Sequence, residues 1–153
     1  MGAIVQSVQS RHSHQIAAVL TSQVDSGAGA AQLANAVAAA WHGIEAALGP
    51  IIGLRGMAAL YKRSLHLSTA QHPWLGALND GAQAPMDLPA LTALLARQSA
   101  TDAAAGGGAL LQTFDTLLVN LVGASLTHRL LAPVWTSSFA TSSAIAPLQH
   151  TSP

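Results

Sequence analysis

Apolar residues recur at intervals of three and four over long parts of this chain, which is the spacing of one face of an α-helix. The clearest stripe predicts a helix over about residues 30–48. Its apolar seam is Leu33, Val37, Trp41, Ile44 and Leu48. Alanine and leucine dominate the composition, and runs of β-branched residues are short, which favours closely packed helices. The pattern therefore predicts an all-α fold.

The same spacing predicts five more helices, which makes about six in a single helical bundle. They cover residues 11–25, 54–70, 88–98, 102–122 and 126–135. Gly49-Pro50 is expected to end the helix over residues 30–48, because the residue before a proline is pushed out of the α region. Three successive glycines, Gly106–Gly108, lie near the start of the predicted helix over residues 102–122. They predict that this start is weak or kinked, or else that another helix packs very closely against it.

Residues typical of turns and helix ends mark a loop, a helix start and a tail. Residues 72–86 contain Pro and Gly at several positions and predict a loop, which Trp74 and Leu75 attach to the core. Asp87, followed by Pro89, has the pattern of a helix N-cap. Residues 136–153 are rich in Ser, Thr and Pro and predict a flexible tail. We expect one helical domain over residues 1–135.

Two ten-residue stretches, IEAALGPIIG and FDTLLVNLVG, resemble each other at an offset of 70 residues. The offset places Glu45 on Asp115 and Gly53 on Gly123. This similarity predicts two equivalent three-helix units, over about residues 11–71 and 87–135. Chance similarity between two leucine-rich helices is the alternative.

Charge is sparse in this chain. Only 8% of residues are charged, and six basic residues balance six acidic ones. The sequence has no basic patch with interleaved aromatic residues, so it does not support a nucleic-acid role. The absence of cysteine excludes disulfides and thiolate metal sites. Carboxylates in the most apolar segments argue against membrane spans. We expect a cytoplasmic protein that binds a protein partner or forms a homo-oligomer.

Glu45 and Asp115 are the first candidate site residues, because a pair of carboxylates facing each other across a bundle can form an acid or metal site. Di-metal bundles use Glu-x-x-His on two helices. Here the order is His42-x-x-Glu45, and Gln112 replaces the histidine in the second copy. We therefore expect the two carboxylates to flank the apolar stripes, with no metal or cofactor.

Arg55, Lys62, Arg63 and His66 form the densest basic cluster. Positions 55, 62 and 66 share a helix face, because they are seven and four residues apart. Such a face is ordinarily solvated. In a chain with so few charges, it is also a candidate contact for an acidic partner or a phosphate-bearing ligand.

The leading functional prediction is a non-catalytic regulatory or protein-interaction domain, because no nucleophile elbow or phosphate-binding loop is present. An alternative is a small-molecule sensor bundle whose pocket between the halves is lined by Trp41, Tyr61 and Phe114. A histidine phosphotransfer domain using His66 or His128 is a further alternative. Neither histidine is followed by the lysine-glycine sequence typical of that family.

Overall fold

The computed structural model describes residue 16 and residues 18–80 and 87–135. In this part of the chain every regular element is a helix, as predicted. Residues 18–25 are helical. The elements that follow are α2 (Ala30–Thr69), the 3₁₀ helix η1 (Pro73–Gly76), α3 (Ala77–Asp80), α4 (Leu88–Ala96), α5 (Ala100–Val122) and α6 (Ala124–Trp135). The expected tail over residues 136–153 lies outside the described residues.

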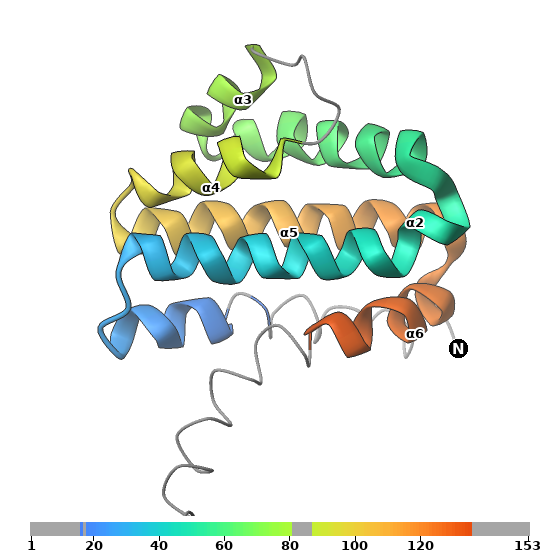
Figure 1. Cartoon of the computed structure of the whole chain (residues 1–153), viewed down its shortest axis with the longest axis horizontal. Coiled ribbons are helices and arrows are strands. Elements are labelled where there is room, and N and C mark those ends of the chain that lie inside the picture. The colour runs from blue at the N-terminus through green and yellow to red at the C-terminus, as the bar shows by residue number, and fades with distance from the viewer. Residues whose placement is uncertain (1–15, 17, 81–86, 136–153) are drawn as a thin grey trace, which may run out of the picture.

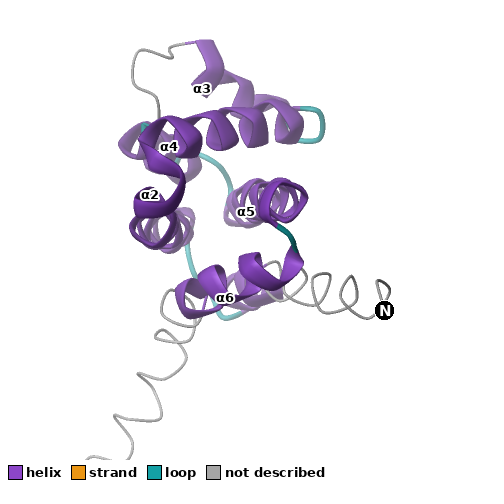
Figure 2. Cartoon of the chain, turned by 90° about the vertical axis from the view of Figure 1, so that its right-hand side faces the viewer, coloured by secondary structure: helices purple, strands orange, loops and turns teal. Residues whose placement is uncertain are grey.

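The helices form a bundle around two long central elements, the first half of α2 and α5. These two lie side by side and run in the same direction (Figure 1). Beyond Gly53 the second half of α2 runs back across the bundle, and beyond Gly123 α6 does the same on the opposite side. Seen end on, the first half of α2 and α5 form the middle layer (Figure 2). The second half of α2 lies on one side of this layer together with α4, and α6 lies on the other side.

The predicted break at Gly49-Pro50 is wrong by one turn. The helix continues past Pro50, and the break comes at Gly53, where φ is 78° and ψ is 167°. Proline removes one hydrogen bond to the preceding turn, and so close to the end of a helical segment this loss is tolerated. The second and third predicted helices are thus one bent element, so the predicted count of six helices is not confirmed.

Two predicted helix starts are set by side-chain caps. Asp87 Oδ1 accepts a hydrogen bond from Ala90 N at 3.0 Å and begins α4, as the sequence predicts. Ser99 Oγ accepts one from Asp102 N at 3.1 Å and begins α5 two residues before the predicted position. The serine cap was overlooked because the apolar stripe of α5 starts only at Ala103.

The segment predicted as a loop is partly ordered as helix. The elements η1 and α3 occupy residues 73–80, while residues 81–86 lie outside the described part. Leu75 is fully buried, and Trp74 packs against Gly106 of α5. These contacts confirm that Trp74 and Leu75 attach this segment to the core.

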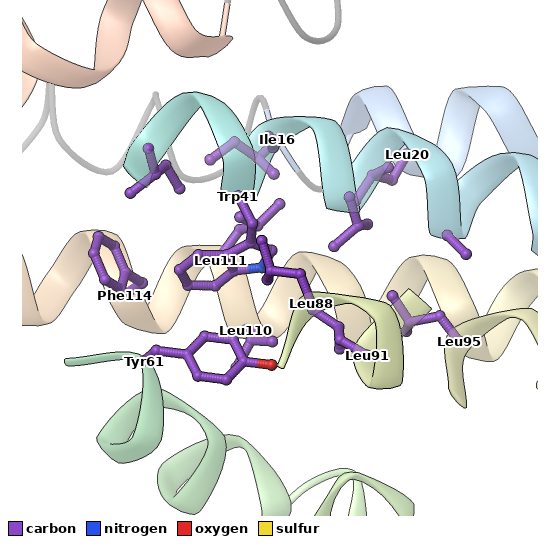
Figure 3. Packing of buried hydrophobic residues seen from close by; sticks show 14 of the residues in the cluster. Ile16, Leu20, Trp41, Tyr61, Leu88, Leu91, Leu95, Leu110, Leu111 and Phe114 are labelled. Atoms are coloured by element: carbon purple, nitrogen blue, oxygen red, sulfur yellow. The ribbon is translucent and has the colours of Figure 1, made fainter. Parts of the chain in front are cut away.

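The triple glycine of α5 marks a close helix contact. All three glycines are helical and buried. A Cβ atom at Gly107 would lie 2.7 Å from Val37 Cγ2, so the backbones of α5 and α2 approach closely at this level. This proximity places the aromatic residues of the two helices, Trp41 and Phe114, in the centre of one continuous core (Figure 3).

Candidate functional site

All four residues of the predicted basic cluster lie on the second half of α2, and all are exposed. They are Arg55, Lys62, Arg63 and His66. No carboxylate occurs between residues 46 and 79, so this half of α2 carries positive charge only. The side chain of His128 is also exposed, on α6.

Next to this cluster lies a surface that the sequence did not single out, which we name the apolar end. It consists of four large aliphatic side chains with exposed fractions between 39% and 73%: Ile51, Leu54, Leu121 and Leu126. They surround the bend of α2 at Gly53 and the turn between α5 and α6 at Gly123. Both turns lie at the same end of the bundle, on the right in Figure 1. In the described part of the chain, the one other large hydrophobic residue with such exposure is Leu67, at 41%.

The charges beside the apolar end all have the same sign. Arg55 follows Leu54 on α2, and Arg129 lies one turn after Leu126 on α6; both are exposed. No Asp or Glu occurs between residues 116 and 135. The apolar end is therefore flanked by arginines, and residues 46–79 and 116–135 around its two turns contain no carboxylate.

Sequence reasoning missed the apolar end because Ile51 and Leu121 continue the same stripes that bury Leu48 and Leu118 three residues earlier. The helical spacing of apolar residues does not by itself show where a helix extends beyond the packed core. The available signal was the glycine two residues after each of them, Gly53 and Gly123, since a chain reversal leaves the adjoining side chains at the bundle end.

The structure gives the two candidate carboxylates different surroundings. Glu45 is partly exposed and makes no side-chain hydrogen bond or ion pair in the described part of the chain. Asp115 is 2% exposed and engaged in an interaction within the chain. The two are therefore not hydrogen-bonded to each other. Among the described residues, no group of three or more His, Asp or Glu side chains is placed to hold a metal ion.

The three candidate pocket aromatics do come together. The Trp41 ring contacts Tyr61 and Phe114 edge to face, with centroid separations of 5.0 Å and 4.9 Å. Trp41 Nε1 and Tyr61 Oη are buried, and neither has a hydrogen-bond partner. Burial, and secondarily the charge of Asp87, raises the pKa of Tyr61 well above its ordinary value. The phenol therefore stays protonated and can donate a hydrogen bond.

The helix α2 is long and apolar enough to cross a membrane by length and composition. It bends at Gly53 and packs against α4 and α5. Comparison of the chain with protein-family models, curated proteins and solved structures finds no match.

Proposed function

We propose that this protein is a non-catalytic, self-associating interaction domain that binds a second copy of itself through the apolar end. The observation that carries the proposal is the gathering of Ile51, Leu54, Leu121 and Leu126 at two neighbouring turns. Scattered exposed leucines are ordinary on protein surfaces, whereas contiguous apolar patches mark interaction sites. The near-zero net charge and the few charged residues add little repulsion between copies.

The size of the patch is compatible with a dimer interface. A standard interface buries about 800 Å² on each partner, and about 60% of that area is apolar. The four exposed aliphatic side chains, together with their partly buried neighbours Ile52 and Val122, offer an apolar area of about 400 Å², the size at which exposed patches are often functional. The polar remainder is supplied by the flanking turns, including Ser125 and Arg55.

The proposal includes two equivalent three-helix units, related by the 70-residue offset. Burial supports it, because Leu33, Trp41, Leu48, Met57 and Leu65 are buried, and so are the residues 70 positions after each of them. The glycines at the two chain reversals support it too. Gly53 and Gly123 both have a positive φ, 78° and 94°, followed by an extended ψ.

If the two three-helix units are equivalent, the apolar end presents two similar turns side by side, which favours self-association. Its two turns present similar side chains, Ile51 and Leu121, at corresponding positions of neighbouring parallel helices. A two-fold dimer uses the same patch on both copies, so a self-similar surface meets this requirement readily. Arg55 then lies at the edge of the contact, while Lys62, Arg63 and His66 lie further along the second half of α2, and we place the assembly in the cytoplasm.

Sedimentation equilibrium tests the proposal. The wild-type protein is expected to show a concentration-dependent monomer–dimer equilibrium, and the double variant Leu54→Gln/Leu121→Gln is expected to weaken it at least tenfold. Leu67→Gln, an equally conservative change at an exposed leucine away from the apolar end, is the control and should leave the equilibrium unchanged. A wild-type protein that stays monomeric up to millimolar concentration would contradict the proposal.

A further inference from the structure

Two hydrogen-bond donors without partners lie together in the core. Trp41 Nε1 and Tyr61 Oη are both buried and both unpaired, although their rings are in contact. Figure 3 shows the indole nitrogen and the phenol oxygen turned toward the same region, beside Leu88 in the first turn of α4. A buried donor without an acceptor destabilises the folded state, because the donor loses its hydrogen bonds to water and gains none in the protein. Two such unsatisfied donors side by side are unusual in a core that consists mainly of aliphatic side chains.

Within the described part of the chain, neither donor has an acceptor at hydrogen-bond distance. Among the buried hydrophobic side chains drawn in Figure 3, leucines and Phe114 lie near the two donors. Backbone carbonyls inside the adjoining helices are occupied by helical hydrogen bonds. Asp87 is close enough to raise the pKa of Tyr61, but it makes no hydrogen bond with the phenol, and its Oδ1 accepts from Ala90 N. The two donors are therefore available to an acceptor from outside the chain.

We propose that the core between α2 and the first turn of α4 binds a small neutral molecule, mainly apolar, whose carbonyl or hydroxyl oxygen accepts hydrogen bonds from Trp41 Nε1 and Tyr61 Oη. The indole group only donates, which fixes the ligand's oxygen as an acceptor. The leucines and Phe114 around it favour an apolar body. No cationic side chain is buried in the described part of the chain, so a charged ligand would pay a large desolvation cost.

The route into this site passes the N-terminal end of α4. This helix has nine residues, and its first turn places Leu88, which is 4% exposed, beside the two donors. Entry of a ring of six carbon atoms requires the Leu88 side chain to rotate and this turn to shift. The long helices α2 and α5 keep their contact through Val37 and Gly107, so the bundle need not open.

Cyclohexanone is the probe, and methylcyclohexane, which has a similar shape but no acceptor, is the matched control. In ¹H–¹⁵N spectra the three tryptophans give three indole signals, and Trp41→Phe identifies that of Trp41. Cyclohexanone is expected to shift the Trp41 indole proton downfield in a saturable manner. Trp74 and Trp135 should be unaffected, and methylcyclohexane should not produce the shift.

Tyr61→Phe removes only the phenol oxygen and should weaken cyclohexanone binding about three- to tenfold, the equivalent of one hydrogen bond. Trp74→Phe removes an indole elsewhere and should leave the affinity unchanged, with circular dichroism confirming that both variants are folded. The proposal is overturned if the Trp41 signal does not respond up to the solubility limit of cyclohexanone. Equal binding to the Tyr61→Phe variant, or a bound internal water seen as a water cross-peak that cyclohexanone does not displace, also overturns it.

Discussion

Single residues set how closely the central helices approach. Gly107 has no side chain to hold α5 away from α2, and Val37, fully buried and β-branched, has little rotamer freedom to make room for one. The sequence predicted a close contact at the triple glycine as one alternative, because glycine is otherwise costly within a helix. It did not identify Val37 as the neighbour, since that depends on the register between two helices far apart in the chain.

Gly107→Ala is expected to destabilise the protein by up to about 2 kcal/mol. Alanine gains about 1 kcal/mol in helix propensity, but forcing a methyl group against Val37 costs about 1–3 kcal/mol. Ala105→Gly, at an exposed position of the same helix, is the matched control, because it changes helix propensity without a steric contact and should cost about 1 kcal/mol. Urea denaturation measures both, and a Gly107→Ala variant more stable than wild type would contradict the close contact.

The phenol of Tyr61 gives the protein a pH dependence in the alkaline range. Burial raises the pKa of Tyr61 in the folded state above the ordinary value of about 10. The unfolded chain therefore ionises first, so this contribution to stability is complete below pH 10 and falls above it, by up to about 1.4 kcal/mol per pH unit.

Urea denaturation between pH 9 and 11 measures this loss, and Tyr61→Phe should reduce it, because Tyr61 is the single tyrosine of the chain. Identical slopes for wild type and variant would show that the phenol ionises as easily in the folded state as in the unfolded one.

At the scale of elements, the helices were largely predictable and their ends were not. The stripe from Leu33 to Leu48 and the Asp87 cap both correspond to observed helices, because burial and capping are local properties of the sequence. The bend at Gly53 was assigned to Pro50 instead. A proline restricts the backbone without deciding where a helix ends, whereas the packing of the second half of α2 on the bundle requires the reversal at a residue that tolerates positive φ.

Gly53→Ala is expected to cost about 1–3 kcal/mol, because a φ of 78° with extended ψ is a conformation that essentially only glycine adopts. If the two halves of the chain are equivalent, Gly123→Ala should cost a similar amount, since its φ is 94° and its ψ is 155°. Thermal denaturation followed by circular dichroism measures both changes. A loss at one glycine and a gain at the other would count against equivalent units.

At the scale of the whole molecule, the sparse charges are unevenly distributed. The apolar end has Arg55 and Arg129 beside it, and no carboxylate occurs in residues 46–79 or 116–135 around its two turns. The composition favours self-association or a protein partner, but it does not indicate which surface makes the contact. The location depends on two turns, at Gly53 and Gly123, being brought to one end of the bundle.

Salt should strengthen dimerisation through this surface. Two copies that meet at the apolar end bring like charges toward each other, and raising NaCl from about 0.05 M to about 0.5 M screens this repulsion. We expect the dimer Kd to fall about two- to fivefold, measured by sedimentation equilibrium. Association that weakens with salt would indicate contacts between opposite charges and would point to an acidic partner for the Arg55–His66 face instead.

The most direct test of the account uses the absence of cysteine, because a single introduced cysteine carries one spin label per chain. Double electron–electron resonance is recorded for Ser125→Cys, at the apolar end, and for Thr101→Cys, exposed near the start of the 23-residue helix α5. An end-to-end dimer predicts a distance below about 35 Å between labels at position 125. Labels at position 101 should be about 70 Å or more apart, because α5 alone spans about 34 Å in each copy. A short distance at position 101, or no intermolecular distance at position 125 at concentrations where the protein sediments as a dimer, would contradict self-association through the apolar end.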